Sequence, residues 1–109
     1  MDELDEDVGA TVLITTGADE DGSPIVVLSG ELDSSNIDQL TEALASILAL
    51  RPKRLIFDLS ELRFMDSAGI SVLVGIAAQI EALQIRDPTP IVRRLIEVTG
   101  LSGVLQVAP

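Results

Sequence analysis

Hydrophobic and polar positions change their period several times along the chain, and each change marks a boundary between predicted elements. Two short runs of mostly β-branched and aliphatic residues, Thr11–Thr15 and Pro24–Leu28, are typical of strands. Turn-forming residues fill the interval 17–23, so we predict a β-hairpin with a generous loop. After Leu28 we expect the chain to leave the sheet over residues 29–33.

A period of three to four residues follows the hairpin and predicts a helix. Its apolar positions lie on one face, at Ile37, Leu40, Leu44, Ile47 and Leu48. Ser35 is the expected N-cap, and Asp38, three positions later, completes a variant of the capping box. The helix is expected to end at Arg51, because the residue before a proline avoids the α region.

A continuous apolar segment, Arg54–Leu59, then predicts a strand that is covered on both faces. We expect residues 60–66 to form a loop that leads back toward a helix. Three apolar side chains are expected to anchor this loop to the core: Leu62, Phe64 and Met65.

The last part of the chain predicts two more helices and two short strands. A mostly apolar helix is expected over Ser67–Ala82, followed by a strand over Leu83–Arg86. The Thr-Pro pair at 89–90 supplies the cap and first position of the last helix. Gly100 suits the C′ position that ends this helix, with Leu101 as its hydrophobic partner.

Residues 103–107 complete the pattern with a short strand or a helical turn. Strands that alternate with helices imply parallel pairs joined by right-handed crossovers. The sequence therefore predicts one α/β domain over residues 11–109, with a mixed, mostly parallel sheet of four to five strands and helices packed against it. Residues 1–10 carry five acids and little to bury, and predict an acidic disordered tail.

Composition narrows the classes of function. The 109 residues include 18 acids and 7 bases, and a net charge of −11 repels nucleic acid and anionic membrane. There is no cysteine and no histidine, which removes the thiol nucleophile, the usual metal ligands and the usual general base near neutral pH. No glycine-rich phosphate-binding motif is present either. We therefore expect no catalytic residue, no cofactor and no metal.

The N-terminus and the apolar segments bear on localisation. The acidic start of the chain lacks the basic and apolar regions of a signal peptide. The longest apolar stretch, Ile70–Ile80, is too short to cross a bilayer. These features lead us to expect a cytoplasmic protein that makes no membrane contact.

Asp66 and Ser67 interrupt the apolar pattern between a strand-like and a helix-like segment. As N-cap, Ser67 would place its hydroxyl at the positive end of a helix whose first amides lack intrahelical partners. Ala68 and Gly69 are small, so a phosphoryl group on the hydroxyl could reach those amides and the helix dipole. On these residues alone, an ordinary helix cap is the better interpretation. Gly69 slightly favours a functional one, because glycine costs roughly 1 kcal/mol relative to alanine inside a helix.

Three ordered segments resemble the STAS-domain anti-sigma factor antagonists. LIFDLSELRFMDSAGISVLVG, residues 55–75, is similar to the family signature in which a D-S-[SA/T]-G-[LI] motif begins a helix. GELD at 30–33 resembles the motif before the first helix, and PTPIVRRLIEVTGL at 88–101 resembles the closing helix. The resemblance covers about residues 11–107 and implies a STAS-type fold.

By this resemblance, Ser67 is the phosphoacceptor of a partner-switching regulator of sigma-factor-dependent transcription in a bacterial stress response. An anti-sigma factor with serine kinase activity would bind the unphosphorylated chain and release the sigma factor. It would dissociate from the chain once Ser67 is phosphorylated. A PP2C-type phosphatase would reset the switch. The residues expected to support recognition or transfer are Asp33, Asp66, Ala68, Gly69 and Ile70.

Several alternatives stay open at this point. Three roles are open for Asp66: assistance in phosphoryl transfer, a contact that the partner recognises, or no role beyond that of a loop carboxylate. The chain departs from the family pattern over 79–87, where no turn residue separates helix from strand, so either the helix ends early or a few residues are absent. Two functions compete with the switch. One is a non-switching STAS scaffold in a signalling or transporter-associated complex, and the other is nucleotide binding near 30–33 and 66–69. The sequence leaves the oligomeric state open.

Overall fold

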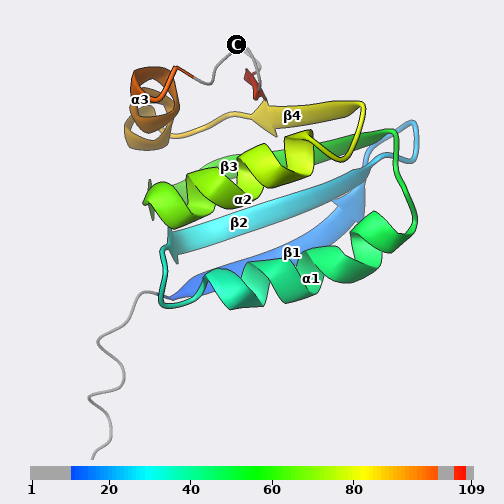
Figure 1. Ribbon diagram of the computed structural model, residues 1–109, viewed down its shortest axis with the longest axis horizontal. Coiled ribbons are helices and arrows are strands. Elements are labelled where there is room, and N and C mark those ends of the chain that lie inside the picture. The colour runs from blue at the N-terminus through cyan, green and yellow to red at the C-terminus, as the bar shows by residue number, and fades with distance from the viewer. Residues whose placement is uncertain (1–10, 101–104, 108–109) are drawn as a thin grey trace, which may run out of the picture.

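The computed structural model of the chain describes residues 11–100 and 105–107. Five strands form one sheet in the order β1-β2-β3-β4-β5 (Figure 1). The strands are β1 (Val12–Ala18), β2 (Pro24–Leu32), β3 (Arg54–Met65), β4 (Ala82–Arg86) and β5 (Gln106–Val107), and the helices are α1 (Ile37–Ala49), α2 (Ser67–Ala77) and α3 (Pro90–Val98). β1 and β2 are antiparallel, and every other neighbouring pair is parallel. The predicted α/β class and the mixed, mostly parallel sheet are confirmed. The tail predicted for 1–10, and Leu101, lie outside the described residues.

The hairpin forms as predicted, but β2 is longer than expected. The turn closes where the Asp19 N–H donates to the Ser23 carbonyl at 2.8 Å. The expectation that the chain leaves the sheet after Leu28 was wrong, because β2 continues to Leu32. Gly30 permits this continuation: its φ is +104°, and a Cβ there would collide with the carbonyl of Thr11 on β1.

The loop predicted for 60–66 was also wrong. β3 continues to Met65 because the extended part of β2 supplies a partner strand, with Leu32 opposite Met65. Leu62 and Met65 are buried as predicted. Phe64 is 46% exposed and anchors nothing, because its side chain points away from the core at the end of the strand.

Helices α1 and α2 lie along one face of the sheet (Figure 1). The core between them is aliphatic apart from Phe57, and includes Leu28, Leu40, Leu55 and Leu73. α2 ends at Ala77 rather than at Ala82, and β4 begins at Ala82, so the departure at 79–87 is explained by a short helix and a short strand.

The first helix begins one residue later than predicted, whereas the last helix begins where the sequence predicted. The N-cap of α1 is Asn36, not Ser35, and its side chain makes no capping hydrogen bond. Thr89 is the N-cap of α3 as predicted, but its hydroxyl donates to the Leu62 carbonyl at 2.8 Å and so ties α3 to β3. Gly100 follows the C-cap of α3 with φ +76°, the left-handed conformation predicted for it.

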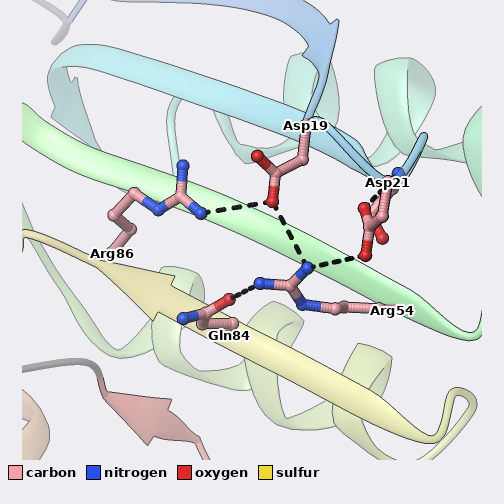
Figure 2. A network of polar contacts seen from close by, with 6 residues as sticks. Asp19, Asp21, Arg54, Gln84 and Arg86 are labelled. Atoms are coloured by element: carbon pink, nitrogen blue, oxygen red, sulfur yellow. Dashed lines mark hydrogen bonds and ion pairs between the residues drawn. The ribbon is translucent and has the colours of Figure 1, made fainter.

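A polar network lies on the face of the sheet opposite α1 and α2 (Figure 2). Arg54 donates to Asp19 at 3.3 Å, to Asp21 at 3.1 Å and to Gln84 at 2.5 Å. Arg86 is 3.5 Å from the same Asp19 carboxylate. The network joins the hairpin turn to β3 and β4 and thereby fixes the turn over the sheet.

Candidate functional site

Asp66, not Ser67, is the N-cap of α2. Its backbone is extended, with φ −104° and ψ −168°, and its carboxylate accepts a hydrogen bond from the Ala68 N–H at 2.9 Å. A carboxylate suits this position because it also interacts with the positive end of the helix. Ser67 is consequently the first helical residue. Its side chain is exposed, and its hydroxyl forms no hydrogen bond within the described part of the chain.

The start of α2 is fixed to the carboxyl edge of the sheet. The Asp66 N–H donates to the carbonyl of Leu32, the last residue of β2, at 3.2 Å. The carbonyl of Asp66 accepts hydrogen bonds from the N–H groups of Gly69, at 3.1 Å, and Ile70, at 3.3 Å. With the Ala68 N–H bonded to the cap, the first amides of the helix are mostly occupied. The prediction that these amides lack partners and could receive a phosphoryl group is therefore corrected.

Gly69 is required for packing rather than for access. It is buried, and a Cβ on it would lie 2.7 Å from the Met65 Sδ and 3.1 Å from the Leu32 Cδ2. Ile70 is only 8% exposed, so it supports the site from within the core and offers little surface of its own. Ala68 is half-buried. These residues hold Ser67 in position from beneath, and Ser67 itself faces solvent.

Asp33 lies in the neighbouring loop, between β2 and α1. One of its carboxylate oxygens accepts hydrogen bonds from the Ser35 hydroxyl at 2.6 Å and from the Ser35 N–H at 2.8 Å. These bonds hold the pKa of the Asp33 carboxyl below its ordinary value of 3.8. Asp33 directly follows Leu32, which is bonded to Asp66, so both carboxylates stand at the same edge of the sheet.

Two residues at this edge were not among the site residues predicted from the sequence. Asn36 is 2% exposed, accepts from the Asp33 N–H at 3.0 Å and donates to the Glu31 carbonyl at 2.8 Å, so it shapes the Asp33 loop. Its place directly before the apolar helix pattern was a signal, because asparagine is a preferred cap residue. Phe64 is the other. Only two residues of the chain are aromatic, and an exposed one near Asp66 has the character of an interface residue.

The described residues contain no group of three or more metal-ligating side chains placed to hold a metal ion. In this part of the chain, no helix is both long enough and apolar enough to cross a membrane.

Comparison with known proteins gives a consistent result. Residues 16–107 match the family model described as "Mlab, STAS domain". The chain is 32% identical over 92 residues to a Bordetella bronchiseptica protein named "Putative anti-sigma factor antagonist BtrV", covering 81% of this chain and 79% of that one. It is 31% identical over 91 residues to the anti-sigma F factor antagonist of Paenibacillus polymyxa, covering 79% and 78%.

A solved structure agrees with these sequence matches. The crystal structure of an anti-sigma factor antagonist from Mycobacterium paratuberculosis superimposes with a TM-score of 0.83 at 27% identity, covering 91% of this chain and 86% of that one. The family model, the relatives and the fold coincide over nearly the whole chain. The protein belongs to the STAS domain family.

Proposed function

We propose that this protein is an anti-sigma factor antagonist, and that phosphorylation of Ser67 controls its binding to the anti-sigma factor. One observation carries the proposal: the Ser67 hydroxyl is exposed and unbonded at the start of α2, while Asp66 performs the capping. The hydroxyl can be modified without removing the cap. The names of the relatives support the class of partner.

The switch follows from charge. A phosphoryl group adds about −1.5 to −2 charges at neutral pH. On Ser67 it stands beside the Asp66 carboxylate, on a chain that already carries a net charge of −11. A partner surface that fits a small neutral hydroxyl then meets a bulky dianion, and a penalty of about 3 kcal/mol would weaken binding by roughly two orders of magnitude.

The partner is proposed to be an anti-sigma factor that acts as a serine kinase on this chain, with a PP2C-type phosphatase that reverses the modification. Asp33, Asp66 and Ala68 are the proposed contacts around Ser67. Gly69 and Ile70 support them from below, because both are buried. Phe64 extends the surface with an exposed aromatic ring. The acids favour a basic surface on the partner.

A phosphorylation assay tests the modified residue. The wild-type chain is incubated with ATP and an anti-sigma factor kinase from the same genome, and the product is analysed by mass spectrometry. We expect one phosphate on the wild type and none on Ser67→Ala. Ser71→Ala is the matched control, because Ser71 is an exposed serine one turn later on α2, and it should still accept the phosphate. Phosphate on any other residue would refute the assignment.

Calorimetry with the same partner tests the charge mechanism. Ser67→Ala should bind about as tightly as the wild type, whereas Ser67→Asp should bind clearly more weakly. Phe64→Ala should weaken binding and slow phosphorylation by the same partner, while the phosphate still goes to Ser67. Equal affinity for Ser67→Ala and Ser67→Asp would contradict the switch and support a scaffold role instead.

A further inference from the structure

β1 is an edge strand that lacks the features by which proteins protect such edges. It is first in the order of the sheet and pairs only with β2 among the described strands (Figure 1). Protected edges carry charged residues, prolines or bulges. Val12–Ala18 has no charged residue and no proline, and it pairs with β2 without a register shift. None of the acids that give the chain its net charge of −11 lies within β1.

The hydrogen bonds at its two ends show which backbone groups of β1 point away from β2. In an antiparallel pair, alternate residues turn both N–H and C=O toward the neighbouring strand. The Thr11 carbonyl accepts from the Glu31 N–H at 2.9 Å, and the Asp19 N–H donates to the Ser23 carbonyl at 2.8 Å. Odd-numbered residues therefore face β2. The groups of the even-numbered residues point outward: Val12, Ile14, Thr16 and Ala18.

We propose that β1 pairs antiparallel with β1 of a second copy of this chain, about a twofold axis at Thr15. In this register Val12 lies opposite Ala18 of the second copy, and Ile14 lies opposite Thr16. Every outward N–H and C=O of the strand then has a partner. Apart from Thr15, which meets its own copy at the axis, each pair sets a larger side chain against a smaller one, and Leu13, which is 64% exposed, lies opposite Gly17.

The charge distribution favours a second copy over a charged peptide as the occupant. The strand offers no charge that would attract such a peptide, and pairing with itself brings no acids face to face within the strand. The remaining acids still repel between copies, so the association should strengthen with salt. Ser67 lies on α2 and takes no part in the pairing, so the dimer is independent of the proposed switch.

A single-cysteine experiment tests the register. The chain has no cysteine of its own, so Thr15→Cys introduces one thiol at the axis. Thr15 would form a non-hydrogen-bonded pair with a Cα–Cα distance of about 4.5 Å, which a disulfide can span. Mild oxidation should link Thr15→Cys into a dimer and leave Ala78→Cys, at the exposed C-cap of α2, monomeric. The absence of the Thr15 link, or equal linking of both variants, would overturn the proposal.

Sedimentation equilibrium tests the backbone pairing in the unmodified chain. We expect a concentration-dependent dimer that is tighter in about 0.5 M than in about 0.05 M NaCl. Thr16→Pro removes an outward N–H while leaving the bonds to β2 intact, and should raise the dissociation constant by about tenfold or more. Thr16→Val keeps that N–H and should leave the constant nearly unchanged. A monomer at all concentrations would refute the pairing, and so would a folded Thr16→Pro variant with the same dissociation constant as the wild type. If Thr16→Pro does not fold, the disulfide test with Thr15→Cys determines whether the strands pair.

Discussion

At the scale of single residues, the start of α2 separates two tasks between two neighbours. Asp66 caps the helix and Ser67 presents an unbonded hydroxyl. If Ser67 were itself the cap, a group attached to its hydroxyl would replace a hydrogen bond that the helix needs, and modification would weaken the fold. The division of tasks lets the charge at Ser67 change while the helix stays in place.

This division predicts different effects for two substitutions of Asp66. Asp66→Ala removes the cap and should lower the free energy of unfolding by about 1 kcal/mol. Asp66→Asn keeps an oxygen for the Ala68 N–H and should lower it much less. Urea denaturation measures both. An equal loss in the two variants would mean that the charge of Asp66, rather than its hydrogen bond, stabilises the helix. If phosphorylation is slow in the folded Asp66→Asn variant, the carboxylate also serves transfer or recognition.

A second residue-scale prediction concerns Asp33 and its bonds from Ser35. Ser35→Ala should raise the pKa of the Asp33 carboxyl toward 3.8, because the Ser35 hydroxyl is the main cause of its lowering. A lowered pKa in the folded state stabilises the fold above 3.8, and this contribution is lost as the pH falls through the folded-state pKa. The stability difference between wild type and Ser35→Ala should therefore shrink in acid. Carboxyl NMR titration measures the pKa, and Ser34→Ala, an exposed neighbour, should leave it unchanged.

At the scale of the elements, the sequence predicted which segments are helices and strands better than it predicted their ends. Hydrophobic period identified the hairpin, three helices and the strand at 54–59. It could not show that β2 and β3 extend to Leu32 and Met65, because those residues are held by pairing with each other. Local composition there, rich in Ser, Gly and Glu, resembles a loop, and tertiary pairing overrides it.

The candidate site was also predictable only in part, because local sequence shows the motif but not the tertiary packing around it. The Asp-Ser pair was visible as an interruption of the apolar pattern, and the three matching segments gave it a meaning. The identity of the cap was not visible, since aspartate and serine are both good N-caps and only the φ and ψ angles decide between them. The burial of Gly69 and Ile70 depends on how α2 packs against Met65 and Leu32, which no local pattern encodes.

The two glycines of α2 give an element-scale prediction with opposite signs. Gly69→Ala places a Cβ against the buried Met65 side chain and should lower the free energy of unfolding by about 1–3 kcal/mol. Gly75→Ala enters open space on the same helix and should raise it by roughly 0.5–1 kcal/mol, because alanine is the better helix former. Thermal or urea denaturation checks both. Stabilisation by Gly69→Ala would show that the helix does not pack as tightly as described.

At the scale of the whole molecule, an excess of acids sets the background against which each ion pair acts. With 18 acids and 7 bases, most carboxylates repel one another, and an average acid should destabilise the fold slightly. Asp19 is different, because its carboxylate is shared between Arg54 and Arg86 on two strands (Figure 2). The side chains of all three are partly buried, at 23%, 33% and 32% exposure, so the pairs are less screened than ordinary surface pairs.

Neutralising one acid should therefore have an effect that depends on which acid is chosen. Asp19→Asn should lower the free energy of unfolding by about 1 kcal/mol, and the loss should shrink at high salt as the pairs are screened. Glu42→Gln removes the same charge from an exposed position of α1 that has no ion pair in the described structure, and should leave the stability unchanged or slightly raised. Urea denaturation of both variants at low and high NaCl distinguishes the two cases. If Asp19→Asn were as neutral as Glu42→Gln, the network would not fasten the hairpin turn to β3 and β4, and the turn would be held by its backbone hydrogen bonds alone.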